Sequence, residues 1–146
     1  MIAQTIQLAL TPVFLLVAIG NILNILSVRL GRTVDRARKL QVLYSETSGE
    51  EHDLVVMEMR SIDRRIALIT RAIRLLVLGG LSIGATVAML FLEDIGNYRL
   101  DRVAAGFFLI AIMLLMWGLT LFLREIQIAA ASLRIREDYL ELHRKL

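Results

Sequence analysis

The chain has 146 residues, of which 57% are hydrophobic and 21% are charged, and its mean hydropathy is +0.66. This length fits one domain, whereas the composition is unusual for a soluble one. The absence of cysteine excludes disulfides and thiolate metal sites. The sequence pI of about 9.8 would suit a nucleic-acid-binding protein, but no such motif accompanies the charge.

The chain opens with residues 1–11, which we expect to form a separate short segment on the outer face of a membrane. Thr11 and Pro12 are typical of a helix N-cap followed by proline at the first helical position. The uncharged residues 12–28 then predict a first transmembrane helix, at the lower end of the roughly 17–25 residues that cross a hydrocarbon core. Nothing basic precedes this run and no small-residue cleavage site follows it, so we interpret it as an anchor rather than a signal peptide.

Small and polar residues interrupt this first span. On a helix of about 3.6 residues per turn, Gly20, Asn24, Ser27 and Gly31 share one narrow face, with Asn21 at its edge. We call these five residues the polar ridge. An amide that faces lipid costs several kcal/mol, so we expect the ridge to face protein or water. It is therefore a candidate either for a packed helix interface or for the lining of a pore on an oligomer axis.

Residues 29–74 predict a cytoplasmic helical hairpin. Its first helix continues the first span to about Ser45, and the spacing of Ser48 and Glu51 predicts a capping box at the start of the second helix. A basic cluster at the start of the hairpin is a candidate site for anionic lipid head groups or the cytoplasmic mouth of a pore. Its members are Arg29, Arg32, Arg36, Arg38 and Lys39.

The second helix has the clearest periodicity in the chain. Apolar or small residues recur there at alternating spacings of four and three, namely Val55, Met59, Ile62, Ile66, Ile69, Ile73, Leu76, Gly80 and Ile83. This pattern predicts one continuous helix of about 40 residues with a coiled-coil seam. The helix would run from the hairpin through residues 75–92, the uncharged second span. Gly80, Gly84 and Ala88, four residues apart, form a second candidate interface in this span.

Residues 93–102 predict an outer turn, and the uncharged residues 103–123 predict the third transmembrane helix. Within it, Ala104, Ala111 and Gly118 recur every seven residues. Residues 124–146 are expected to continue as a cytoplasmic C-terminal helix with two opposite apolar stripes. The first stripe is Leu123, Ile126, Ala130, Leu133 and Leu140, and the second is Ile128, Ala131, Ile135, Tyr139, Leu142 and Leu146. Two apolar sides need two partners, which predicts a homo-oligomer unless helices of the same chain cover both sides.

Basic residues are segregated along the chain. Residues 1–28 contain no Lys or Arg, residues 29–74 contain ten, residues 93–102 contain two and residues 124–146 contain five. The positive-inside rule therefore places the N-terminus outside and the C-terminus in the cytoplasm. We predict an all-α integral membrane protein of one structural domain, with three transmembrane helices extended into a cytoplasmic helical bundle or coiled coil.

No catalytic, cofactor-binding or metal-binding motif is present, and we expect a protein that is not an enzyme and has no cofactor. No ionisable residue lies in the middle of a predicted span, which disfavours a proton-coupled transporter or a voltage sensor. His52 and His143 are expected to be solvated. The expected partners are the lipid bilayer and further copies of the chain, with another membrane or cytoplasmic protein as an open alternative and no nucleic acid.

Three stretches resemble a known family: RLGRTVDRAR at the end of the first span, RRIALITRAI before the second and FLREIQIAAASLRI after the third. Together they resemble the bacterial membrane family of domain of unknown function 2721, over roughly residues 8–135. The most specific part is the cluster Arg29, Arg32, Asp35, Arg36 and Arg38. The resemblance implies three spans and no established activity. The order of elements is also similar to that of YidC/Oxa-type insertases, but an analogy of topology does not establish function.

Two functions fit these patterns. The favoured one is a homo-oligomeric scaffold or assembly protein of the bacterial inner membrane. The alternative is an oligomeric channel for ions or small solutes, with the polar ridge lining its axis.

Overall fold

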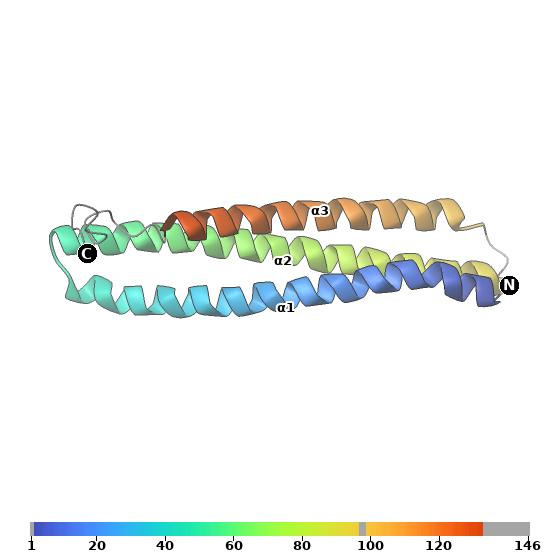
Figure 1. Ribbon diagram of the computed structural model, residues 1–146, viewed down its shortest axis with the longest axis horizontal. Coiled ribbons are helices and arrows are strands. Elements are labelled where there is room, and N and C mark those ends of the chain that lie inside the picture. The colour runs from blue at the N-terminus through green and yellow to red at the C-terminus, as the bar shows by residue number, and fades with distance from the viewer. Residues whose placement is uncertain (1, 97–98, 133–146) are drawn as a thin grey trace, which may run out of the picture.

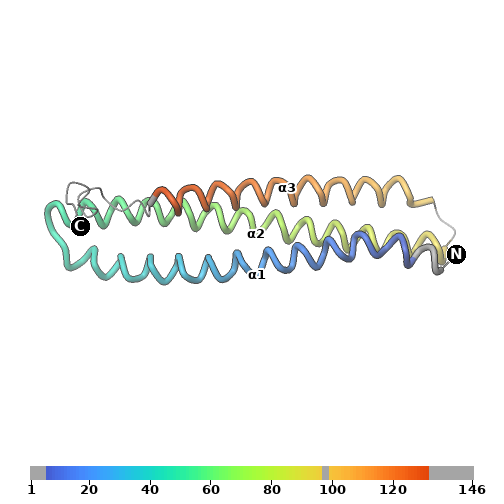
Figure 2. The backbone as a smooth tube through the Cα atoms, viewed as in Figure 1, coloured from blue at the N-terminus to red at the C-terminus, as the bar shows by residue number. Residues whose placement is uncertain are grey.

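The computed structural model describes residues 2–96 and 99–132, which form three long helices. They are α1 (Ile2–Glu46), α2 (Glu50–Gly96) and α3 (Asp101–Ser132). The helices lie side by side and alternate in direction, so that the described residues build one elongated bundle (Figure 1, Figure 2). The described ranges contain no strand, and the all-α prediction with three long apolar helices is confirmed. The predicted helical continuation through residues 133–146 lies outside the described residues.

The helix α1 begins ten residues before Pro12, so the predicted helix start at Thr11 and Pro12 is wrong. Proline lacks an N–H and crowds the preceding turn, which usually breaks a soluble helix. In apolar surroundings a break would leave further backbone groups unpaired, and an uninterrupted helix is favoured for that reason. The proposed outer-face position of residues 1–11 stays a prediction.

The turn between α1 and α2 depends on Gly49, whose φ of 69° lies in the left-handed region that favours glycine. The Asp53 N–H donates to the Gly49 carbonyl at 3.3 Å, and α2 begins at Glu50. Gly49 therefore takes the cap position, and the capping box predicted at Ser48 is wrong. The predicted break itself is confirmed, and three acidic residues occupy the first turn of α2, where they complement the helix dipole.

The core of the bundle is built from residues that recur every seven positions. In α1 the buried series is Pro12, Ile19, Leu26, Thr33 and Leu40; in α2 it is Ile62, Ile69, Leu76 and Ile83; in α3 it is Ala104, Ala111, Gly118 and Glu125. The predicted seam of α2 thus supplies the core, because four of its nine members are fully buried and the others are partly buried. Supercoiling of the helices into a coiled coil stays a prediction.

Small residues let α2 and α3 approach closely. A Cβ atom built on Gly118 would lie 3.1 Å from Cγ of Leu76 and 3.5 Å from the carbonyl oxygen of Ala72. A Cβ atom on Gly79 would lie 3.5 Å from the carbonyl oxygen of Ala111. The seven-residue repeat of small residues in α3 is therefore the face that packs on α2, as small residues do between helices in membranes.

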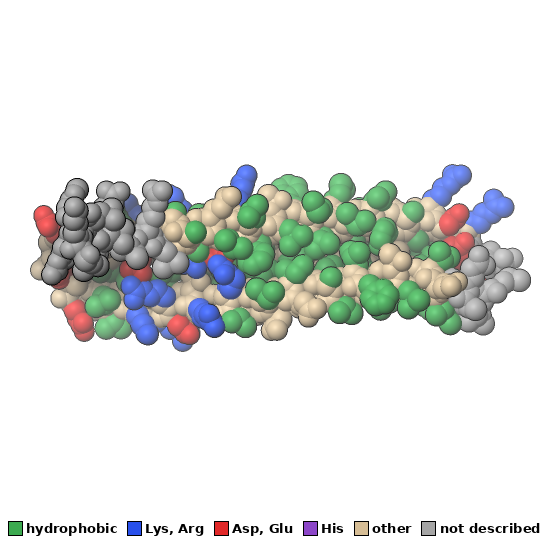
Figure 3. Space-filling model, in the orientation of Figure 1, with side chains coloured by type: hydrophobic (Ala, Val, Ile, Leu, Met, Phe, Trp, Pro, Cys, Tyr) green, Lys and Arg blue, Asp and Glu red, His purple; other side chains and the backbone are tan. Residues whose placement is uncertain are grey.

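A band of apolar side chains covers the middle of the face of the bundle seen in Figure 3, while charged side chains gather toward its two ends. All three helices are long and apolar enough to cross a membrane. Each contains an 18-residue apolar stretch, and the mean hydropathy of these stretches is 2.1, 2.3 and 2.4 for α1, α2 and α3. Only 17%, 22% and 11% of these stretches is buried inside the bundle. Apolar surface this extensive needs an apolar solvent, which indicates a multi-pass membrane protein.

Candidate functional site

One carboxylate lies at the centre of a charged cluster that joins all three helices. Glu125 of α3 has an exposed fraction of 0%. Arg29 of α1 donates to its Oε2 from Nε at 3.0 Å and from Nη2 at 2.8 Å. Arg65 of α2 donates from Nε to its Oε1 at 3.0 Å. We call these three residues the Glu125 cluster; it carries a formal charge of +1.

The Glu125 cluster joins α1 to α3, a pair of helices whose backbones otherwise make little contact. α2 packs along both neighbours, whereas the backbones of α1 and α3 approach each other much less closely. Arg29 crosses that wider gap, and its guanidinium carbon also lies 5.7 Å from the centroid of the Phe122 ring of α3. A cation above an aromatic face is attracted by the ring quadrupole. The α1–α3 contact at this level is therefore largely polar.

Both arginines of the cluster are partly exposed at the surface of the bundle. The side-chain exposed fractions are 32% for Arg29 and 22% for Arg65, against 0% for Glu125. Partial hydration lowers the cost of holding the cations, while the carboxylate has exchanged its water for three charge-assisted hydrogen bonds. A buried ion pair of this kind adds little net stability over apolar packing, but removing one partner is costly. The chemistry of the cluster suits the alignment of three helices rather than catalysis.

A second ion pair lies farther along the hairpin. Arg36 of α1 donates from Nε to Oε1 of Glu58 at 2.7 Å and from Nη2 to Oε2 at 2.9 Å. The hydrogen bonds from Arg36 to Glu58 raise the pKa of the Arg36 guanidinium above its ordinary value. Both side chains are well exposed, so this bidentate pair joins α1 to α2 with little net stabilisation.

The polar ridge lies on the outside of the bundle. All five of its members, Gly20, Asn21, Asn24, Ser27 and Gly31, are exposed. A Cβ atom on either glycine would meet nothing within 4 Å. The ridge is therefore not an interface between helices of one protomer, and its assignment to an interface between copies or to a pore stays a prediction.

The glycines predicted as an interface in α2 likewise have open space beside them. Gly84 is exposed and Gly80 is partly buried, and a Cβ atom on either would meet nothing within 4 Å. The close approach to α3 is made instead by Gly79, one residue earlier in the chain. One residue along a helix turns the side-chain direction by about 100°, so the four-residue row of glycines points away from the partner helix.

The predicted basic cluster is divided by the fold. Arg29 binds Glu125 and Arg36 binds Glu58, so these two guanidinium groups already have carboxylate partners. Arg32, Arg38 and Lys39 are exposed and form no ion pair within residues 2–96 and 99–132. A role of the five in binding lipid head groups or in forming a pore mouth stays a prediction.

The apolar stripes predicted for the inner part of α3 do not form its packed face. Leu123, Ile126 and Ala130 of the first stripe are exposed, whereas Glu125 and Ala129 between the stripes are buried. The charged Glu125 enters the core because two arginines neutralise it there, which an apolar pattern does not register. The remaining positions of both stripes beyond residue 132 lie outside the described residues.

Sequence reasoning missed Glu125 and Arg65 as a site. The signal was the seven-residue repeat of Ala104, Ala111 and Gly118, whose next member is position 125.

His52 also differs from the expectation of a solvated side chain. It is partly buried, its ring centroid lies 4.5 Å from that of Tyr44, and its buried Nδ1 has no hydrogen-bond partner in the part of the chain that the structure describes. His143 lies outside the described residues.

The family model described as "Protein of unknown function (DUF2721)" matches residues 9–135. The chain belongs to this family. The match covers α1 from residue 9 onward, the whole of α2 and α3, and every member of the Glu125 cluster, so it confirms the resemblance given by the arginine-rich end of the first span. No curated protein and no solved structure matches this DUF2721 chain.

Among the described residues, no group of three or more His, Asp or Glu side chains could hold a metal ion.

Proposed function

We propose that this DUF2721 protein is a homo-oligomeric scaffold of the bacterial inner membrane, in which the polar ridge of α1 is covered by another copy of the chain. The observation that carries the proposal is the exposure of Asn21 and Asn24 on the apolar part of α1. Neither side-chain amide forms a hydrogen bond to another group among the described residues.

The physical argument concerns what surrounds those amides. A primary amide has two N–H donors and a carbonyl acceptor, and hydrocarbon offers them no partners. A second copy brings its own ridge, whose amides can pair with these. Gly20, Ser27 and Gly31 on the same face allow the backbones to approach closely.

A scaffold role is supported by what fills the bundle. Leu26, Ile69 and Leu76 are completely buried along its axis, which leaves no room there for a conducting path through one protomer. Beyond the apolar band, toward the turn that joins them, α1 and α2 continue together as a long hairpin with charged sides. Under the positive-inside rule this hairpin lies in the cytoplasm, where it offers a surface for a partner protein.

An axial pore between copies is a second candidate, because amides exposed on the outside of α1 would equally suit water. In that arrangement Arg32, which is exposed, would supply a ring of positive charge at the mouth and favour anions. Arg29 is less suited to that role, because it is bound to Glu125.

The oligomer is tested by native mass spectrometry of the full chain in lipid nanodiscs or mild detergent. The wild type should give one discrete multimer, and Asn24→Leu should weaken it by about fivefold in dissociation constant, since an interhelical hydrogen bond in lipid contributes about 1 kcal/mol. Thr120→Leu is the matched control, because the Thr120 hydroxyl is exposed on α3 but donates to the Met116 carbonyl of its own helix at 2.9 Å. A wild type that is monomeric at all lipid ratios would overturn both candidates.

Ion flux into vesicles separates the two candidates. The scaffold predicts no flux above that of empty vesicles. The channel predicts flux that falls with Asn24→Leu and changes its anion preference with Arg32→Glu. Flux that neither substitution alters would count against a pore lined by the polar ridge.

A further inference from the structure

A groove of about 610 Å³ lies between α2 and α3. The predicted basic cluster of α1 contributes none of the residues that line it. Its cationic lining comes from Arg64 and Arg71 of α2 and Arg124 of α3. Leu68 and Ile128 supply apolar walls, and the Gln127 amide adds a neutral donor. We propose that this groove, called here the α2–α3 groove, binds the head group of an anionic phospholipid through its phosphate.

The charges of the groove favour an anion. Arg64, Arg71 and Arg124 are exposed, and none of them forms an ion pair with another residue of the described ranges. Arg29, Arg36 and Arg65 differ, because each is bonded to a carboxylate within the chain. The three groove arginines therefore keep their full complement of guanidinium donors for a ligand.

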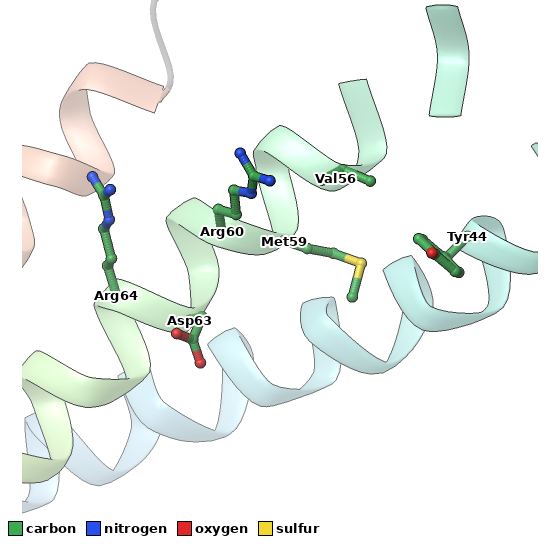
Figure 4. A pocket seen from close by; sticks show the side chains of 6 residues that line it. All are labelled: Tyr44, Val56, Met59, Arg60, Asp63 and Arg64. Carbon is green, nitrogen blue, oxygen red and sulfur yellow. The ribbon is translucent and has the colours of Figure 1, made fainter. Parts of the chain in front are cut away.

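Among the described residues that line the groove, Asp63 is the one that is acidic, so these four charged groups sum to a formal +2. It also lines the neighbouring pocket between α1 and α2. The Asp63 carboxylate points toward α1, whereas the Arg64 side chain extends to the other side of α2, toward α3 (Figure 4). The carboxylate thus lies at the edge of the groove, and the arginines determine the potential inside it.

The groove lies where a head group would be. No charged residue occurs in residues 75–92 or 103–123, and Arg71 and Arg124 lie within four residues of the ends of those apolar stretches. A phospholipid whose acyl chains lie along the apolar band therefore brings its phosphate to the level of these guanidinium groups. Arginine binds phosphate in a bidentate manner, and basic pockets between membrane helices suit anionic head groups.

This inference requires the membrane placement of the proposed function and does not require the oligomer. The experiment is native mass spectrometry of the full chain in mild detergent, titrated with phosphatidylglycerol or with phosphatidylcholine of the same acyl chains. The wild type should retain phosphatidylglycerol about tenfold more strongly. The double substitution Arg71→Gln with Arg124→Gln should remove that preference.

The matched control is Arg32→Gln with Arg38→Gln, which removes two exposed arginines of α1 that lie outside the groove. It loses the same charge and should keep the preference. An equal loss in both double variants would overturn the site, since it would show only unlocalised attraction to positive charge. If the groove double variant does not fold, Arg64→Gln should lower the preference by a smaller factor, and an unchanged preference would overturn the proposal.

Two further outcomes would also overturn the proposal. A wild type without any preference for phosphatidylglycerol would show that the three arginines do not make the groove selective for an anionic head group. Complete displacement of the lipid by millimolar inorganic phosphate would assign the groove to a free anion. The same spectra count subunits, so a monomer that prefers phosphatidylglycerol keeps the lipid site while removing the oligomer, and a multimer without the preference does the reverse.

Discussion

At the scale of single residues, the position of Glu125 is the unusual feature of this protein. A carboxylate with no exposed surface is held by two arginines of the other two helices. These arginines lie 96 and 60 residues away from it in the chain. The desolvation of Glu125 is balanced only while both cations remain. The cluster therefore penalises any arrangement in which one of the three helices is shifted along its axis.

We expect Glu125→Gln to lower the free energy of unfolding by about 3 kcal/mol. This is the lower end of the roughly 3–5 kcal/mol for breaking a buried pair, because both arginines are partly hydrated. The loss arises because the amide leaves two guanidinium groups facing each other without a counter-charge. Unfolding of the full chain in mixed micelles, followed by circular dichroism, measures it.

Glu58→Gln is the control for this substitution. It removes the same charge from the exposed Arg36–Glu58 pair, and it should cost less than about 1 kcal/mol. Equal costs at positions 125 and 58 would contradict the assignment of a structural role to burial of the Glu125 cluster.

At the scale of the helices, the packing of α3 on α2 depends on a row of small residues. Gly118 is buried against Leu76 and Ala72, and Leu76 is itself completely enclosed. A side chain at position 118 can be accommodated only if Leu76 or the α3 backbone moves. Gly106, on the same helix, has no neighbour within 4 Å of the position that its Cβ would take.

We expect Gly118→Ala to destabilise the bundle by about 1–2 kcal/mol, in the range of overpacked cores. Gly106→Ala should be neutral or stabilising by up to about 1 kcal/mol, because alanine is the better helix former. The same micelle unfolding assay measures both. If both substitutions shifted stability in the same direction and by the same amount, the close α2–α3 approach at Gly118 would be refuted.

At the scale of the whole molecule, the segregation of charge predicts the orientation in the membrane. The α1–α2 turn lies at the end of the bundle that carries most of the basic residues, and the α2–α3 connection lies at the opposite end. Because the chain has no cysteine, single cysteines can report on each end separately.

In intact cells, a membrane-impermeant thiol reagent should label Asp94→Cys and should leave Gln41→Cys unlabelled. Both positions are exposed, so the difference would report the side of the membrane rather than burial. Permeabilised cells should label both variants. The reverse pattern in intact cells would invert the topology and would place the hairpin outside.

The sequence by itself determined that the described residues form three long apolar helices, with a break near Gly49 and an apolar band along the middle of the bundle. These depend on local properties, namely runs without charge, helical periodicity and a residue that tolerates positive φ. The heptad spacing in α2 correctly identified the buried residues Ile62, Ile69, Leu76 and Ile83, because an apolar seam on one helix needs no knowledge of its partner. The family match over residues 9–135 agrees with these inferences.

Only the tertiary structure decided which faces meet. Helix rotation and axial register are set by all contacts together, so the sequence pointed to Gly80 and Gly84 where Gly79 makes the close approach. Register also brings Arg29, Arg65 and Glu125 to one level, and it leaves Arg64, Arg71 and Arg124 around a groove. Charges far apart in the chain have no local pattern that pairs them, because their attraction acts through space between helices whose alignment must already exist.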